Sequence, residues 1–308
     1  MTKKRSIENL QTALFADAEI GDQWSMQNNA GNGTQMNDQH TKITLVSIAV
    51  ILLCVSGCQN AESTSSNPDS SKSADTQRAG NESTLIQYGR MREVIGLKKS
   101  HGRIALVEAT SRPHLYAVGA LAGLTGEVTL IDGEVVATTV TEGHQLEPLE
   151  LNHELQATLL VGSHISAWTD HTVSEAVPPQ GFDAYIEQLA NTQGIDLSSP
   201  FVFMVTGDFV DVRLHVIQGA CPVHAKMHGI ELSHDEKPFE ASFSRRKGTL
   251  VGVFAKDAAG DLTHPDSSTH THIIFNQSTS DSKLTAHVEQ IGLAAGSVIR
   301  LPKPRIKE

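Results

Sequence analysis

The chain has 308 residues, a formal net charge of −11 and 39% hydrophobic residues. This length allows one large domain or two small ones. The acidic balance argues against a nucleic-acid surface, because neutralising phosphates requires clustered Lys and Arg. We therefore expect no nucleic-acid partner.

Cysteine and histidine are used very differently. The three cysteines, Cys54, Cys58 and Cys221, are too few for a disulfide framework, and only Cys221 falls in the part expected to fold. Of the 15 histidines, all but His40 lie beyond Cys58. Imidazole is the commonest side chain that binds Zn²⁺, so the folded part is the place to look for a metal site.

The N-terminal region has the pattern of an export signal. Residues 1–40 show no apolar period, and an apolar run of roughly 13 residues follows Lys42, which suits a signal peptide and is shorter than the roughly 20 residues that cross a bilayer. Val55-Ser56-Gly57-Cys58 then resembles a bacterial lipobox, whose cysteine is acylated. We interpret residues 1–58 as leader and lipoprotein signal peptide with Cys58 as the lipidation site; a short membrane helix is the alternative.

Residues 59–83 are rich in Ser, Asn, Asp and Thr, a composition typical of a disordered tether. The folded domain is then expected over residues 84–308. Together these assignments predict a protein that is exported from the cytoplasm into the cell envelope and contacts the membrane through its lipid anchor only.

The folded part is predicted to be mainly strand. Residues 124–131 and 134–140 flank Asp132-Gly133, a strong hairpin signal. Residues 182–193 have a helical apolar face followed by Gly194, and residues 218–237 are expected to be irregular. These patterns favour an α+β fold of mainly mixed β-sheet with few helices; the remaining strands are expected at residues 155–168, 201–217, 248–255, 269–276 and 284–291.

His270-Thr271-His272 is the sharpest candidate for a metal site. Residues two apart on a strand point to one face, so the two imidazoles lie together. If the next strand pairs as a hairpin centred between Thr279 and Ser280, His287 lies opposite His272, and opposed Cβ atoms are about 4.5–5.5 Å apart. Three His ligands leave a fourth position for water or substrate, as in catalytic zinc sites. The alternative is a half-exposed strand with solvated imidazoles.

Over roughly residues 115–295 the sequence resembles the acetolactate decarboxylase family. Each matching segment is short, and their order along the chain is the specific part. The segments are Gly119-Ala120-Leu121 with Leu124-Thr125-Gly126-Glu127, Gly207-Asp208-Phe209, Lys237-Pro238-Phe239, Gly248-Thr249-Leu250-Val251-Gly252, His270-Thr271-His272 and Ala286-His287-Val288.

The resemblance implies two packed sheets, a Zn²⁺ ion held by His270, His272 and His287, and Glu127 as the catalytic carboxyl group. It also implies decarboxylation of 2-acetolactate to acetoin and CO₂. This chemistry suits the residues, because a Lewis-acid metal stabilises the charge of an enediolate and a carboxylic acid can protonate its carbon. Judged by position alone, Glu127 is more simply a solvated residue beside a turn.

The chain departs from the family pattern at three places. Where the family has a substrate-binding arginine, the alignment places His215, with Arg213 on the same strand face; both are candidate substrate-binding residues. Residues 218–237 look like an insertion whose Cys221 and histidines are more simply a polar loop than further ligands. With Glu308 as the last residue, we expect no counterpart of the family's C-terminal active-site carboxylate.

Two functions therefore follow from the sequence. The first is a zinc-dependent carboxy-lyase that acts on a small keto acid such as 2-acetolactate. The alternative is a non-catalytic metal- or ligand-binding envelope lipoprotein derived from the same fold. A homodimer is the candidate assembly.

The first testable prediction concerns the anchor. A start at Met36 leaves a short leader with Lys42 beside the apolar run, so we expect translation from Met36 and a mature protein that begins with acylated Cys58. Mass spectrometry of the membrane fraction should find this modified N-terminus. An unmodified peptide that spans Gly57-Cys58 would contradict the prediction.

Overall fold

The computed structural model describes residues 85–111, 113–277 and 281–303. The predicted leader, Cys58 and the predicted tether lie outside them. The named elements, in chain order, are β1 Ile86–Tyr88, η1 Arg92–Gly96, β2 Ile104–Ala105, α1 Leu106–Thr110, β3 Leu115–Leu121, η2 Ala122–Leu124, β4 Gly126–Ile131, β5 Glu134–Val140, β6 Leu146–Leu149, β7 Gln156–His164, β8 Trp168–Thr172, η3 Pro179–Gly181, α2 Phe182–Gln193, β9 Phe201–Val216, α3 Pro222–His228, η4 His234–Glu236, β10 Phe239–Phe254, β11 Thr269–Asn276, β12 Lys283–Leu293 and β13 Val298–Pro302.

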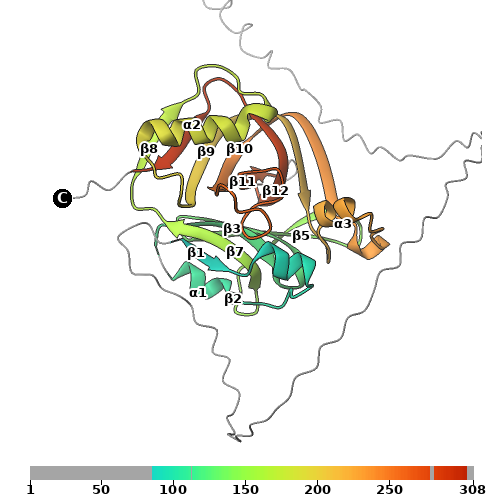
Figure 1. The fold of residues 1–308 in the computed structure, drawn as a ribbon. Helices are drawn as coiled ribbons and strands as arrows, with labels where there is room; N and C mark the ends of the chain where they lie inside the picture. Colours follow the sequence, from blue (N-terminus) through green and yellow to red (C-terminus); the bar gives the residue numbers. More distant parts are fainter. Residues whose placement is uncertain (1–84, 112, 278–280, 304–308) are drawn as a thin grey trace, which may run out of the picture. The chain divides into compact units, whose positions relative to one another are not determined.

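The strands form two sheets (Figure 1). The first, sheet A, has the order β1-β7-β3-β4-β5-β6, with β2 also paired to β7. The second, sheet B, has the order β10-β11-β12-β9-β13-β8. All pairings between named strands are antiparallel, so the expected mixed sheet is in fact antiparallel. The expected two packed sheets with few helices are confirmed.

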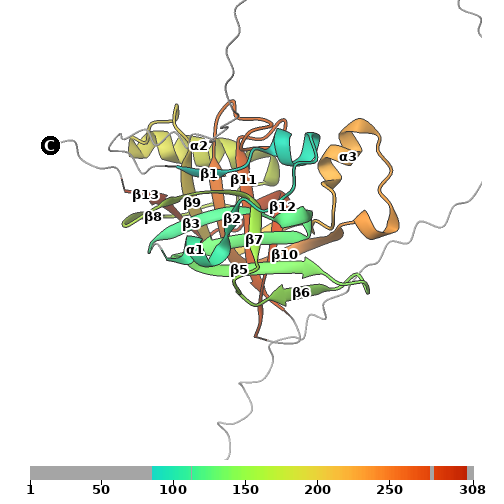
Figure 2. The same ribbon diagram turned by 90° about the horizontal axis from the view of Figure 1, so that it is seen from below.

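Four strands of sheet B close on themselves. β9 and β10 pair along almost their whole length, from Phe201↔Phe254 to Val216↔Phe239. β11 pairs with β10, β12 pairs with β11, and β12 also pairs with β9. Each of these strands therefore has a neighbour on both edges, which satisfies the backbone hydrogen bonds of a buried sheet. The view in Figure 2 shows the strands of sheet A in front of this group.

Two local predictions hold in detail. Asp132 and Gly133 have φ values of 53° and 82°, the left-handed conformations that a tight hairpin turn requires, and they join β4 to β5. Helix α2 covers the predicted residues and ends at Gly194, whose φ of 80° is that of a helix C-cap. Phe182, Ile186 and Ala190 of α2 are buried in the core cluster of sheet B, so the helix covers one face of that sheet.

Two element predictions were wrong. The segment expected to be irregular contains the seven-residue helix α3, which begins at Pro222 and ends at Gly229 in the left-handed conformation. Strand β10 begins at Phe239, well before residue 248, because its polar first half pairs with β9. The sequence pattern missed the first half of β10 because its residues are polar, and pairing with the long strand β9 makes it a strand. Within the described residues no helix is long and apolar enough to cross a membrane.

The two sheets pack face to face through residues of several strands. Val118 and Val161 of sheet A share a buried cluster with Val202, Met204 and Val251 of sheet B. At about 25 cal/mol per Å² of apolar surface, burial of this kind is the main favourable term holding two sheets together. Polar side chains of the two sheets also contact one another, and these side chains belong to the candidate site.

We predict that Gly162 of β7 tolerates no side chain. A Cβ atom there would collide with the carbonyl oxygen of Tyr116 and with the Cβ atom of Ala117. Gly162→Ala should therefore lower the free energy of unfolding by about 1–3 kcal/mol, measured by urea denaturation. The matched control is Gly143→Ala, whose nearest atom, Thr141 Oγ1, is 3.8 Å away; equal losses in both variants would contradict the prediction.

Candidate metal centre and active site

Three histidines meet on one face of sheet B. His270 and His272 alternate with Thr271 along β11, and the strand pleat turns both imidazoles to the same side. On β12, His287 pairs directly with His272, which confirms the predicted register. The exposed fractions of the three residues are 3%, 0% and 6%, so the alternative of solvated imidazoles is excluded.

The three rings form a nearly equilateral triangle. Ring centroids are 5.2 Å apart for His270 and His272, 5.1 Å for His270 and His287, and 5.4 Å for His272 and His287. One nitrogen from each ring lies within 4.8 Å of the other two. Three imidazoles around a tetrahedral zinc, with Zn–N bonds of about 2.0–2.1 Å, have centroids about 5 Å apart. The triangle therefore has the size that one ion requires.

Burial keeps these rings neutral. It lowers the pKa of His270 to about 3, and it holds the pKa values of His272 and His287 well below the ordinary value of 6.5. His270 also lowers the pKa of His272, and both of them lower that of His287, since positive charges at this distance repel. At neutral pH each imidazole thus has a free lone pair, which is the form that binds a metal.

Two imidazole nitrogens of the site have no hydrogen-bond partner within the described part of the chain, which suggests that they bind a ligand. His270 Nδ1 and His272 Nε2 are buried and make no hydrogen bond within the described part of the chain. A buried polar atom without a partner costs about 1–3 kcal/mol. The other nitrogen of His272, Nδ1, lies 3.2 Å from Thr129 Oγ1, which is 2.6 Å from Thr285 Oγ1. These hydroxyls orient the ring as partners of metal ligands do, so the residues fit a bound metal ion.

Glu127 of β4 adds a carboxyl group from sheet A. It is 3% exposed, and its Oε2 lies 3.6 Å from His272 Nε2. Burial raises its pKa to about 8, although the backbone N–H of Ile217, which donates to Oε1 at 3.3 Å, works in the opposite direction. Without a metal ion, Glu127 is therefore protonated at neutral pH, and its carboxyl group can donate a proton within the site.

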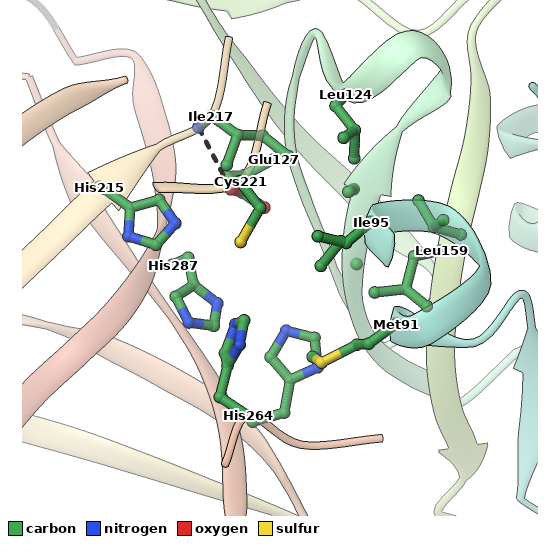
Figure 3. Close-up of a pocket in the computed structure, with 14 residues that line it drawn as sticks. Met91, Ile95, Leu124, Glu127, Leu159, His215, Ile217, Cys221, His264 and His287 are labelled. Atoms are coloured by element: carbon green, nitrogen blue, oxygen red, sulfur yellow. Dashed lines mark hydrogen bonds between the residues drawn. The ribbon is translucent and has the colours of Figure 1, made fainter. Parts of the chain in front are cut away.

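Glu127, His270 and His287 line a small cavity (Figure 3). Glu127, His215, His270 and His287 form its polar wall, and the space open to water measures about 30 Å³. Cys221 also lines it, but burial raises the thiol pKa to about 11. Without a metal ion the sulfur is thus protonated at neutral pH, and Cys221 is not among the three residues that gather around the candidate metal position.

The two candidate substrate-binding residues have different surroundings. His215 of β9 is 2% exposed, pairs with His287 across the strands, and has its ring 4.7 Å from that of His287. Arg213 is about half exposed and lies outside the cavity wall, where its Nε is 3.7 Å from Glu289 Oε2. The structure therefore brings His215, and not Arg213, to the cavity.

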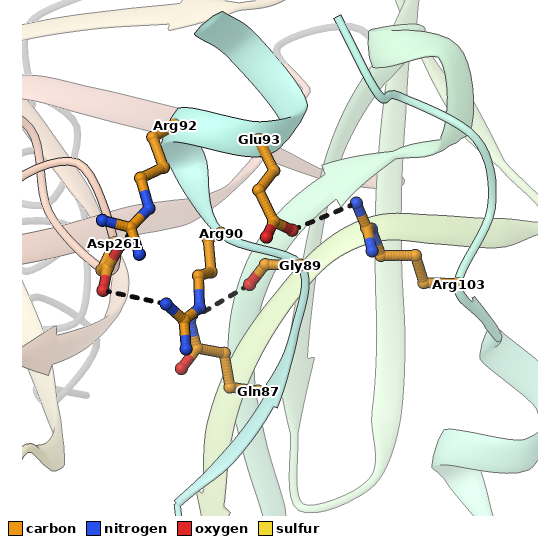
Figure 4. A network of polar contacts seen from close by, with 7 residues as sticks. All are labelled: Gln87, Gly89, Arg90, Arg92, Glu93, Arg103 and Asp261. Carbon is orange, nitrogen blue, oxygen red and sulfur yellow. Dashed lines mark hydrogen bonds and ion pairs between the residues drawn. The ribbon is translucent and has the colours of Figure 1, made fainter. Parts of the chain in front are cut away.

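The segment of residues 91–95 closes the apolar side of the cavity. Met91, Val94 and Ile95 line it, and polar contacts fix their segment to a distant loop (Figure 4). Arg92 and Arg90 lie 3.1 and 3.7 Å from the carboxylate of Asp261. Exposed ion pairs add little by themselves, but backbone hydrogen bonds from Met91 and Arg92 to the same loop reinforce them.

The same loop contributes a histidine that the sequence pattern did not single out. His264 lines the cavity, and its ring is 5.1 Å from that of His287. Burial lowers its pKa to about 4. Its place in an irregular connection leaves no periodic signal, although it stands only six residues before His270. The rings of His224 and His228 of α3 have centroids 4.3 Å apart and are tilted by 50°, and neither residue is a member of the candidate metal-binding group.

Comparison with known proteins identifies the fold. No protein-family model and no curated protein matches the sequence. The structure is similar to that of α-acetolactate decarboxylase from Bacillus subtilis strain 168, with a TM-score of 0.53 and 16% identity over 72% of this chain and 87% of that chain. Acetolactate decarboxylase from Bacillus subtilis subspecies spizizenii gives the same score and identity over 72% and 88%. The chain therefore has a fold like that of acetolactate decarboxylase, at a sequence identity that shows the fold alone.

Proposed function

We propose that this protein is a zinc-dependent carboxy-lyase that converts 2-acetolactate, or a related 2-hydroxy-3-keto acid, to acetoin and CO₂. One observation carries the proposal: three buried imidazoles converge on one point, and the buried carboxyl group of Glu127 lies 3.6 Å from one of them. The fold likeness to acetolactate decarboxylases supports the choice of reaction.

The residues would divide the chemistry between them. His270, His272 and His287 would hold Zn²⁺, which supplies Lewis-acid stabilisation of the oxygens that gain charge as CO₂ leaves. The bond between the carboxylate and C2 would break, its electron pair would form a double bond between C2 and C3, and the carbonyl pair would move to the keto oxygen to give an enediolate. Glu127 then donates its proton to C2, which yields acetoin and leaves a carboxylate to be reprotonated from water.

The cavity is small enough to exclude most water from the proposed reaction. Exclusion of water strengthens electrostatic interactions inside a site and prevents unwanted proton transfer. The space of about 30 Å³ holds one or two water molecules, so a keto acid enters only when side chains of the wall move. Met91 and Ile95 are the candidates, since methionine adapts easily to a new shape.

We also propose that the protein works in the cell envelope, held to the membrane by lipid on Cys58. The pattern of residues 43–58 supports this location. Its partners would be a small keto acid and, through the anchor alone, a lipid bilayer. A homodimer remains the proposed assembly.

The metal content tests the first half of the proposal. We expect about one Zn²⁺ per chain, and His272→Ala or His287→Ala should empty the site because each removes one of three ligands. His224→Ala is the control, since His224 lies outside the group; it should keep its zinc. Elemental analysis of the purified proteins makes the comparison, and loss of zinc from the His224 variant alone would place the site in the insertion.

The catalytic role of Glu127 is tested by Glu127→Gln. This variant should keep zinc but lose roughly 10²–10⁴ in turnover, because an amide cannot supply the proton. Glu134→Gln is the matched control: Glu134 is exposed and pairs with Lys283 at 2.9 Å, so its rate should equal that of the wild type. Acetoin release from racemic 2-acetolactate is the assay. Equal rates with and without zinc would remove the lyase and leave a metal-binding lipoprotein.

A further inference from the structure

The cavity has no room for a keto acid while its walls stay in place, since the space open to water measures about 30 Å³. Its polar wall lies on β4, β9, β11 and β12, which pair with neighbours inside the two sheets. A strand inside a sheet moves little, because it would have to give up a ladder of backbone hydrogen bonds. A ligand therefore enters through a part of the wall that lies outside the strands.

Two segments outside the strands line the cavity and are joined to each other. The first, which we call the flap, is residues 90–96 and contributes the side chains of Met91, Val94 and Ile95. The second is the β10–β11 loop, residues 255–268, which contributes His264. The boundary between the flap and this loop is thus a boundary of the cavity itself.

The flap has a backbone suited to movement. Its centre, η1, is a single turn of π-helix, a form that occurs in short pieces and frequently at functional sites. Gly89, with a φ of 73°, comes directly before the flap, and Gly96 ends it. Glycine tolerates the changes of φ and ψ that a hinge must absorb. The side chains of Met91 and Ile95 therefore belong to a segment that can move as a unit.

Asp261 of the β10–β11 loop holds the flap in place. Its Oδ1 lies 3.1 Å from Arg92 Nε, and its Oδ2 lies 3.7 Å from Arg90 Nη1 (Figure 4). The backbone N–H of Met91 donates to the carbonyl oxygen of Asp261 at 3.2 Å, and that of Arg92 donates to the carbonyl oxygen of Gly260 at 2.6 Å. Both ion pairs of the flap with this loop thus depend on one carboxylate.

The β10–β11 loop is the fixed side of this contact. Leu262 and Thr263 are 7% and 0% exposed. Asp183 of α2 accepts hydrogen bonds from the backbone N–H of Ser268 and from the hydroxyl of Thr269, both at 2.7 Å. The loop is therefore held from the helix as well as from its own strands, and the flap is the side that moves.

We propose that residues 90–96 form a flap that opens the cavity to ligands, and that Asp261 is the latch that keeps it closed. Met91 and Val94 are 4% and 1% exposed, so opening uncovers apolar surface and open molecules are rare. Loss of the Asp261 carboxylate makes them more frequent. The flap would admit an ion as well as a keto acid, so this inference goes beyond the proposed reaction and needs neither zinc nor turnover.

Cys221 reports the opening, because it lines the cavity and is 6% exposed. The full-length, metal-free protein is treated with iodoacetamide at constant pH, and mass spectrometry follows modification of the peptide that contains Cys221. When opening and closing are faster than the reaction, the rate of modification is proportional to the fraction of open molecules. Asp261→Ala should raise this rate about twofold to tenfold, as expected for the loss of two exposed ion pairs.

Asp170→Ala is the matched control. Asp170 forms an ion pair of the same kind with Arg300 at 3.3 Å, between β8 and β13 and away from the cavity wall. This variant should react at the wild-type rate. Arg92→Ala should raise the rate, and the double variant Arg92→Ala, Asp261→Ala should react no faster than Asp261→Ala, because the second change removes a contact that is already lost.

The outcomes decide between the latch and a general loosening. A Cys221 rate in Asp261→Ala equal to that of the wild type, or equal to that of Asp170→Ala, would overturn the proposal. If Asp261→Ala fails to fold, Arg92→Ala is judged by the same two comparisons. A protein that binds no zinc or releases no acetoin would refute the proposed function and would leave these comparisons intact, since the modification of Cys221 requires neither.

Discussion

Three uncharged imidazoles share a buried face between two β-sheets, and the rest of the site is arranged around the cost of holding them there. Charged imidazoles would repel one another at centroid distances of 5.1–5.4 Å. Burial removes the charge but leaves His270 Nδ1 and His272 Nε2 without partners in the described part of the chain. A metal ion bound at this place would resolve both problems, since it would satisfy the lone pairs and requires neutral ligands.

Neither sheet builds this site alone. Sheet B supplies the histidines, while sheet A supplies Glu127 and the Thr129 hydroxyl that bonds His272. The Thr138 hydroxyl of sheet A also accepts a hydrogen bond from the backbone N–H of Thr285. These polar contacts fix how the sheets face each other, because each buried polar group needs its partner. Apolar packing around Val118 and Val251 excludes water from the interface, so a polar group there that lost its partner would remain unsatisfied.

The two segments that close the apolar side of the cavity are held by weaker contacts than the sheets are. The segment that contains Met91 and the loop that contains Asp261 and His264 are joined by exposed ion pairs and a few backbone hydrogen bonds. Such contacts are weaker than the packing of the sheets. The structure thus combines a rigid polar wall on strands with an apolar wall that depends on weaker contacts, a distribution suited to a cavity that must admit its ligand.

The sequence by itself determined what local periodicity records. The alternation in His270-Thr271-His272 and the hairpin to β12 predicted the candidate metal-binding group and its register, and Asp132-Gly133 and Gly194 predicted a turn and a helix end. Only the tertiary structure decided the rest. His215 and Glu289 meet through the pairing of β9 with β12 and through a bulge, and His264 arrives on an irregular loop. Long-range pairing and irregular backbone leave no period in a sequence, because their partners lie tens of residues away and are chosen by packing.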